Sequence, residues 1–217
     1  MTLSRSGPDP QLIQALFERF EEDKPAPRTE LDFINPFTLL VAVALSAQTT
    51  DKAVNKATEP LFKLADNPQA MLDIGEERLM QMIGSIGLYR NKARNVMALC
   101  RILLEQYGGE VPLNREALVS LPGVGNKTAS VVLNELNIAP AIAVDTHVFR
   151  VSHRLGLVDA SANTPDKVEK QLMAVIPAKW LTRAHHWLIL HGRYTCVARK
   201  PKCDICIVRH LCPRIGL

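Results

Sequence analysis

Hydrophobic residues recur at helical spacing along most of the chain, so the sequence predicts one helix after another. Between Pro10 and Glu22 the apolar positions form a single stripe, made by Leu12, Ile13, Leu16, Phe17 and Phe20. Asn35-Pro36 begins a second helix, because Asn caps helices well and Pro fits the first helical position. This helix runs to about Ser46 and is almost entirely apolar, which predicts a buried, central place for it.

Capping and turn residues mark the remaining helices. Asp51 is expected to cap the next one, and an apolar loop at residues 86–90 is expected to precede a long helix from Asn91 to Tyr107. Two further helices should begin at Asn67-Pro68 and at Gly75. Helices are also expected after Asn114, after the glycine-rich turn at 121–125, after Asp145 and after Thr164, and the last helix of the chain should be Arg183–Tyr194. Only residues 141–144 could be extended, and one such run makes no sheet. The predicted fold is therefore all-α.

Composition indicates a globular protein with a substantial core. The 217 residues are 47% hydrophobic and only 5% aromatic, with Leu and Ala frequent, which favours helices over strands. No apolar run is long enough to cross a membrane, and residues 1–10 are polar with two prolines, unlike a signal peptide. We therefore expect a soluble, cytoplasmic protein with no membrane partner.

Positive charge is concentrated near the C-terminus. The whole chain carries a net charge of +4, yet residues 193–214 alone hold six basic residues and one acid. The basic residues are Arg193, Arg199, Lys200, Lys202, Arg209 and Arg214. A polyanion partner would explain such a segment, and so would a solvated basic tail; composition does not separate the two.

Four of the five cysteines lie in the same segment. Cys196, Cys203, Cys206 and Cys212 have the spacing Cys-x6-Cys-x2-Cys-x5-Cys, whereas Cys100 lies alone on an apolar helix face and is expected in the core. In a cytosolic chain such clustering indicates a metal site rather than disulfides. Four thiolates suit either zinc or a [4Fe-4S] cluster, and the single Cys-x2-Cys pair leans towards iron–sulfur. A metal there would make the basic loop between Cys196 and Cys203 a rigid phosphate-binding edge.

Residues 121–129 read Leu-Pro-Gly-Val-Gly-Asn-Lys-Thr-Ala and predict a helix-hairpin-helix, two short helices joined by a tight turn. Gly123 and Gly125 allow positive φ and let another backbone come close. The N–H groups at the start of the second helix suit a DNA phosphate, bound without sequence selectivity. An ordinary glycine-containing turn is the alternative, and the length of the motif favours DNA binding.

Lys127 lies in the first turn of that second helix, where the helix dipole disfavours a positive charge. Local violations of this kind often mark functional sites. The side chain would either contact a phosphate or act as a nucleophile, because a neutral lysine amine forms Schiff bases at carbonyl-like carbons. The C1′ of a sugar that has lost its base is such a carbon. The helix N-terminus and partial burial would both favour the neutral amine.

Asp145 stands in Ala-Val-Asp-Thr-His, residues 143–147, directly before a predicted helix. Its carboxylate could take a proton from the lysine, or stabilise the positive charge that grows on a sugar as a glycosidic bond breaks. Aspartate in this place is also among the commonest helix N-caps. The two roles are compatible, since a cap is a rigidly placed carboxylate.

Together these motifs resemble the endonuclease III family of DNA glycosylases, over nearly the whole chain. Besides the hairpin, the Ala-Val-Asp-Thr-His segment and the cysteine spacing, three stretches carry the resemblance: Ser-Ala-Gln-Thr-Thr-Asp (46–51), Ile-Gly-Leu-Tyr (86–89) and His-Gly-Arg-Tyr-Thr-Cys (191–196). The resemblance implies two lobes. One is a six-helix barrel with the helix-hairpin-helix, residues 29–139; the other is a discontinuous iron–sulfur cluster domain, residues 1–28 and 140–217.

The resemblance also implies a bifunctional base-excision repair enzyme, a glycosylase and abasic-site lyase, whose partner is double-stranded DNA with a damaged pyrimidine or an abasic site. It would flip out and remove oxidised pyrimidines, then nick the strand by β-elimination through a lysine Schiff base.

The resemblance assigns roles to single residues. Lys127 would be the nucleophile, Asp145 the catalytic carboxylate, and the four clustered cysteines the ligands of [4Fe-4S]. Gln48 would fill the gap left by the extruded nucleotide, and Leu88 would wedge beside the orphaned base. The other expected DNA contacts are Gly123, Gly125, Arg199, Lys200 and Lys202. We expect a monomer in the cytoplasm, associated with the nucleoid of a bacterial-type cell.

Three other functions fit parts of the sequence. A mismatch adenine glycosylase shares the barrel and the cluster, but it typically lacks the lysine and carries a further C-terminal domain, whereas five residues follow Cys212 here. A non-catalytic helix-hairpin-helix module and an iron–sulfur electron carrier would each use only some of the motifs. Asn126, beside the lysine, is often basic in the family, which predicts slightly weaker DNA binding.

Overall fold

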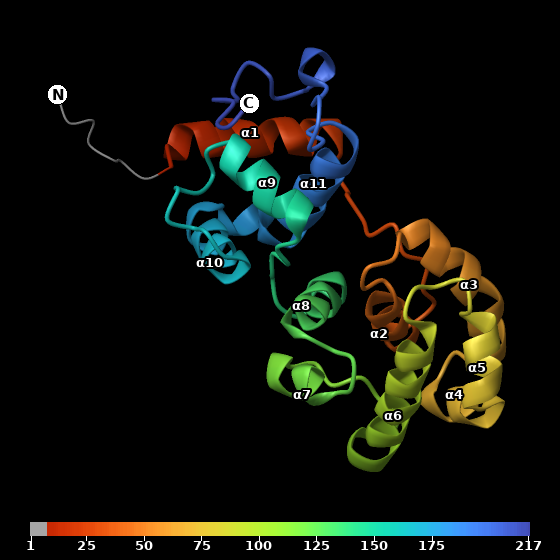
Figure 1. Ribbon diagram of the computed structural model, residues 1–217. Coiled ribbons are helices and arrows are strands. Elements are labelled where there is room, and N and C mark those ends of the chain that lie inside the picture. The colour runs from red at the N-terminus through yellow and green to blue at the C-terminus, as the bar shows by residue number, and fades with distance from the viewer. Residues whose placement is uncertain (1–7) are drawn as a thin grey trace. The chain divides into compact units, whose positions relative to one another are not determined.

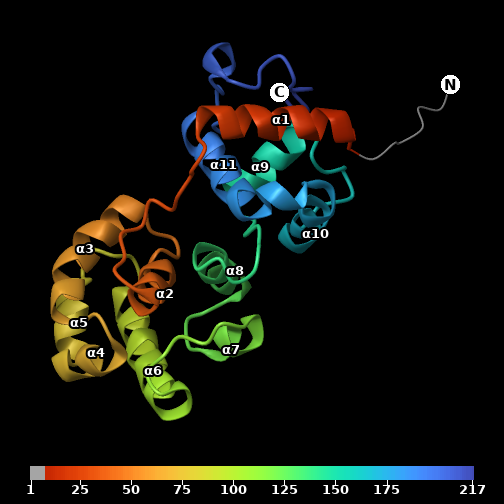
Figure 2. The same ribbon diagram turned by 180° about the vertical axis from the view of Figure 1, so that it is seen from behind.

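The computed structural model describes residues 8–217, and every regular element in this range is a helix (Figures 1 and 2). The all-α prediction is therefore confirmed. The expectation about a signal peptide rests partly on residues 1–7, which lie outside the described residues. None of the described helices combines the length and the apolar content needed to cross a lipid bilayer.

The chain forms two compact units. Residues Thr29–Ile138 make up the first, which we call the hairpin unit because it contains the glycine-rich turn. The described residues on either side of it make up the second, which we call the cysteine unit. Each has its own hydrophobic core.

The hairpin unit is organised around α2 (Pro36–Leu45), which is buried along nearly its whole length, as its apolar sequence predicts. Its start is fixed by a capping box: the Asn35 side chain accepts from Thr38 N at 2.9 Å, and Thr38 Oγ1 accepts from Asn35 N at 2.9 Å. Helices α3 (Asp51–Leu64), α6 (Tyr89–Tyr107) and α8 (Asn126–Glu135) pack against α2. The unit is completed by α4 (Pro68–Ile74), α5 (Glu76–Met82) and α7 (Arg115–Ser120).

Two predicted helix starts in this unit are wrong by one or two residues. Thr50, not Asp51, caps α3, and its Oγ1 accepts from Ala53 N at 3.3 Å. Asp51 becomes the first helical residue, where a negative charge suits the positive end of the helix dipole. Helix α6 begins at Tyr89 rather than Asn91, because Leu88 turns the chain into it in a left-handed conformation.

The cysteine unit joins the N-terminal helix to the C-terminal third of the chain. An aromatic cluster fills its core, where Phe17 stacks on Trp180 with ring centres 5.7 Å apart and Phe20 stacks on Trp187 at 6.4 Å. The buried segment 141–144 forms no strand. Its helical elements are α1 (Pro10–Asp23), α9 (Thr146–Arg154), α10 (Pro165–Val175), η1 (Ala178–Trp180), α11 (Leu181–Tyr194) and η2 (Cys203–Ile205).

Candidate functional site

The glycine-rich turn joins α7 to α8, and the two helices pack against each other, which is the helix-hairpin-helix expected from the sequence. Leu121 and Val124 are buried and anchor the turn, and Val124 N donates to Leu121 O at 3.1 Å. Between them Gly123 has a φ of +78°, a conformation that favours glycine. A Cβ on Gly123 would lie only 3.0 Å from Cβ of Asn95 on α6, so this glycine is needed for packing as well.

Gly125 differs from the prediction. Its φ is −95°, because it is the N-cap of α8 and caps leave the helix with extended backbone. It needs no positive φ, and nothing lies within 4 Å of the position its Cβ would take. The open space in front of this glycine leaves the start of α8 accessible to another chain.

Lys127 lies in the first turn of α8, directly beyond that open space, and its side chain is exposed. The partial burial expected from the sequence is therefore wrong. No side chain caps α8, and the start of a helix is where backbone N–H groups can bind a phosphate. The dipole of α8 acts on the amine of Lys127 whether or not the side chain is buried.

Asp145 is the N-cap of α9 in the cysteine unit, as the sequence predicts. Its Oδ1 accepts from His147 N and from Val148 N, each at 2.8 Å. The side chain is half-buried, and two hydrogen bonds to one oxygen fix the orientation of the carboxylate. Lys127 belongs to the hairpin unit and Asp145 to the cysteine unit.

Gln48 and Leu88 are both exposed, and both have left-handed backbone conformations, with φ of 56° and 60°. Such a conformation costs a residue other than glycine about 1–3 kcal/mol, and it persists only where the surroundings impose it. Leu88 exposes 62% of its surface although it is a large hydrophobic residue. Because both side chains are exposed on a backbone of unusual conformation, these two positions are candidates for contact with a ligand.

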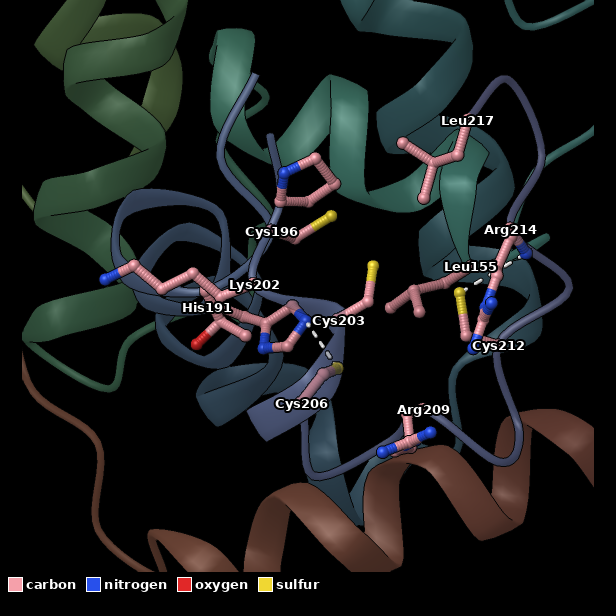
Figure 3. A pocket seen from close by; sticks show the side chains of 12 residues that line it. Leu155, His191, Cys196, Lys202, Cys203, Cys206, Arg209, Cys212, Arg214 and Leu217 are labelled. Atoms are coloured by element: carbon pink, nitrogen blue, oxygen red, sulfur yellow. Dashed lines mark hydrogen bonds between the residues drawn. The ribbon is translucent and has the colours of Figure 1, made fainter. Parts of the chain in front are cut away.

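The four clustered cysteines line one pocket in the cysteine unit, and Figure 3 shows their sulfur atoms pointing into it. Cys196 follows α11, Cys203 is the first residue of η2, Cys206 directly follows η2, and Cys212 lies near the chain end. Three groups that can hydrogen-bond sulfur surround them: Arg154 Nη1 is 3.5 Å from Cys196 Sγ, His191 Nε2 is 3.7 Å from Cys206 Sγ, and Arg214 N is 3.4 Å from Cys212 Sγ.

The donor set suits a metal centre, because four cysteine side chains line one pocket. A [4Fe-4S] cluster takes one cysteine on each of its four iron atoms, so the number of thiols matches its ligand number. Burial raises the pKa of Cys206 and of Cys212, and the charges of the other cysteines raise both further. Four adjacent thiolates therefore need a metal to balance their charge.

The basic loop between Cys196 and Cys203 is tied to α9. Arg154 donates to the carbonyl oxygens of Val197 at 2.8 Å and of Ala198 at 3.0 Å. Beyond this tether Arg199, Lys200 and Lys202 are exposed, and Lys200 has a φ of 53°. The structure therefore presents these three charges on a held loop rather than on a free tail.

The motifs in the sequence do not single out one side chain of the hairpin unit that contacts the candidate site. Lys92 on α6 is buried, with 8% of its surface exposed, and its ammonium group contacts the turn that carries Gln48. A signal existed in the sequence: the lysine occupies the apolar face of α6, in line with the buried Val96, Leu99 and Leu103. A charged residue in such a stripe indicates a buried polar contact.

Comparison with known proteins agrees with this geometry. The model of the family "HhH-GPD superfamily base excision DNA repair protein" matches residues 41–178, and that of the "Iron-sulfur binding domain of endonuclease III" matches residues 196–212. Endonuclease III of Rickettsia conorii is 55% identical over 202 residues, which cover 93% of this chain and 95% of the relative. The chain belongs to the endonuclease III family. It is therefore a base-excision repair enzyme, a DNA glycosylase and lyase, and its cofactor is a [4Fe-4S] cluster.

Further relatives support the assignment to the endonuclease III family. Endonuclease III of Escherichia coli K12 is 54% identical over 197 residues, which cover 91% of this chain and 92% of the relative. The solved "Structure of a Trapped Endonuclease III-DNA Covalent Intermediate: Estranged-Adenine Complex" matches with a TM-score of 0.87 and 47% identity, covering 95% of this chain and 96% of that one. Membership excludes the non-catalytic DNA-binding module and the electron carrier, and the iron–sulfur match decides against zinc.

Proposed function

We propose that this member of the endonuclease III family removes oxidised pyrimidines from duplex DNA with Lys127 as nucleophile and Asp145 as catalytic carboxylate. The observation that carries the proposal is the exposed Lys127 in the first turn of α8, beside a glycine that leaves the helix start open. The N–H groups of that turn would hold the DNA backbone, which would bring a sugar to the lysine. A single chain carries both groups and the four cysteines, so the enzyme is proposed to act as a monomer, in the cytoplasm with the nucleoid.

The chemical steps follow from the two side chains. The damaged base leaves the stack, and neutral Nζ of Lys127 attacks C1′ while the bond from C1′ to the base breaks and the base takes up a proton. Asp145 stabilises the positive charge on the sugar and accepts a proton from the lysine. Opening of the sugar ring gives an imine between Nζ and C1′. Loss of a proton from C2′ then expels the 3′ phosphate, which is the β-elimination that nicks the strand.

The two units have separate parts in the proposal. The hairpin unit would be the barrel domain, in which Gln48 fills the gap in the duplex and Leu88 wedges beside the unpaired base. The cysteine unit would be the cluster domain, in which Cys196, Cys203, Cys206 and Cys212 hold the iron–sulfur cluster. When bound, the cluster balances the thiolate charge and holds the basic loop for phosphate contact.

Lesion preference is tested directly by a panel of duplexes. We expect base release from DNA with oxidised pyrimidines, and little release from duplexes that differ only in having an oxidised or alkylated purine. The measurement is free base released, with strand nicking followed in parallel. A preference for purines would contradict the proposed substrate class while leaving the lysine chemistry intact.

The ligand assignment is tested by substitution of Cys203. Cys203→Ala is expected to lose most of the iron and the visible absorbance of the protein, because a cluster held by four thiolates loses one of them. Cys100→Ala is the matched control, since Cys100 is buried on α6 outside the pocket, and this variant should keep its iron. Normal iron content in Cys203→Ala would contradict the assignment.

The basic loop is tested through salt dependence. Replacing both Lys200 and Lys202 by alanine is expected to weaken binding to all duplexes alike and to reduce the slope of log K against log salt by about 0.9 for each phosphate that the loop no longer neutralises. The measurement is a titration of damaged and undamaged duplexes at several salt concentrations. An effect confined to one type of lesion would contradict this role.

A further inference from the structure

Lys92 has an unusual environment for a lysine. The side chain is buried in the hairpin unit, and its Nζ donates to three oxygens: Leu45 O at 2.9 Å, Ala47 O at 2.7 Å and Thr49 Oγ1 at 2.9 Å. An ammonium group has three hydrogens, so every donor is used. Burial lowers the pKa of Lys92, and the three oxygens offset part of that effect by favouring the charged form.

The three acceptors belong to the turn that carries Gln48. Leu45 is the last residue of α2, and Ala47 and Thr49 stand on either side of Gln48. Gln48 itself has a left-handed φ of 56°, which is strained because the residue is not a glycine. The ammonium group therefore caps the end of α2 and holds both neighbours of a strained, exposed residue.

The same turn of α6 also holds Leu88. Lys92 N donates to Leu88 O at 3.1 Å, the first hydrogen bond of the helix, so one residue contacts Leu88 through its backbone and the two neighbours of Gln48 through its side chain. Asn95, three residues further along α6, packs against Gly123 of the glycine-rich turn. The first two turns of α6 thus support three separate loops of the hairpin unit.

Lys92 itself does not contact DNA in this arrangement. Its ammonium group is occupied by protein oxygens, and a buried cation cannot reach a phosphate. A residue that only packs at this point of an apolar helix face would be apolar, as Val96 and Leu99 are on the same stripe. The ammonium group is required only because the turn at Gln48 presents carbonyl oxygens to the interior.

We propose that Lys92 is a positioning residue that holds Gln48 in its left-handed conformation and at a fixed place relative to Leu88, so that the enzyme distinguishes damaged from intact DNA. The inference rests on the proposed roles of Gln48 and Leu88. Both side chains must enter the duplex together, and a turn that relaxed after removal of the ammonium group would direct Gln48 elsewhere. General affinity for DNA would not depend on Lys92.

The test compares two duplexes, one with a tetrahydrofuran abasic-site analogue and one undamaged. Lys92→Met, which nearly keeps the length of the side chain and removes the ammonium group, is expected to weaken binding to the analogue duplex about tenfold. Binding to the undamaged duplex should stay within about twofold, and its salt slope should not change, because the variant still neutralises the same phosphates. A decrease in the salt slope, or equal weakening on both duplexes, would overturn the proposal.

A double-mutant cycle links Lys92 to Gln48. Gln48→Ala should lower selectivity for the analogue by itself, and Lys92→Met should then add little to it, because the side chain it positions is gone. If Gln48→Ala leaves selectivity unchanged, the proposed role of Gln48 fails. If Gln48→Ala lowers selectivity and Lys92→Met does not, or if the two effects add in full, only the inference about Lys92 fails.

Two variants separate positioning from stability. Met71→Ala makes a cavity at a buried residue of α4 in the same unit, and it should lower the melting temperature without changing selectivity. Thr49→Val removes one acceptor and leaves the lysine in place, so it should reduce selectivity in the same direction as Lys92→Met and by less. Thr49→Val decides the question if Lys92→Met does not fold, and unchanged selectivity in Thr49→Val would then overturn the proposal.

Discussion

Lys127→Ala is expected to abolish strand nicking at abasic sites and covalent trapping by borohydride. The trapped adduct is a reduced imine between Nζ and C1′, and no other group is proposed to form it. Loss of a covalent nucleophile lowers turnover by at least about a thousandfold. Because Lys127 is exposed, the variant should fold and melt as the wild type does. The measurements are gel detection of the borohydride adduct and the rate of nicking.

Asn126→Ala is the matched control for Lys127→Ala, since Asn126 is also exposed and is the first residue of the same helix. This variant should trap and nick normally. Binding of Lys127→Ala to undamaged DNA should remain, because backbone N–H groups at the start of α8 do not depend on the side chain. An adduct formed as readily by Lys127→Ala as by the wild type would disprove the nucleophile assignment.

Asp145→Asn is expected to slow base release about a hundredfold to a thousandfold while leaving the fold intact. The substitution separates the two roles of the residue, because Asn caps helices as well as Asp does and keeps an oxygen for His147 N and Val148 N. Only the negative charge is lost. Base release from a damaged duplex should therefore slow, while the melting temperature should stay close to that of the wild type.

The control for Asp145→Asn is a variant that removes only a cap. Thr164 caps α10 in the same unit, where its Oγ1 accepts from Lys167 N at 3.4 Å. Thr164→Ala should destabilise the protein by about 1 kcal/mol and leave base release unchanged. Full activity in Asp145→Asn would show that the carboxylate serves α9 as a cap and nothing more.

Features set by local chemistry could be predicted from the sequence, and the structure bears them out. The Asn35 cap and the uniformly apolar run after it specify α2 and its burial, and the position of Asp145 directly before a helical segment predicts the N-cap that the structure has. Gly123 takes the positive φ expected of it. In each case the local sequence suffices for the prediction, although the close approach of Asn95 on α6 also requires a glycine at position 123.

Features set by tertiary contacts could not be predicted in the same way. Gly125 is extended because it caps α8, and the exposure of Lys127 depends on how α7 and α8 pack. The left-handed backbone at Gln48 and Leu88 could not be predicted, because neither residue is a glycine. The neighbours of Gln48, Ala47 and Thr49, accept hydrogen bonds from Lys92, a residue more than forty positions away along the chain.

Burial raises the pKa of Cys100 to about 12, which leaves this thiol un-ionised and unreactive in the folded protein. Its inertness has a practical consequence for handling the enzyme. A thiol-modifying reagent applied under native conditions would report on the four cysteines of the C-terminal pocket without background from the fifth. The extent of labelling then measures what fraction of a preparation has lost its metal, and labelling of Cys100 marks molecules that have unfolded.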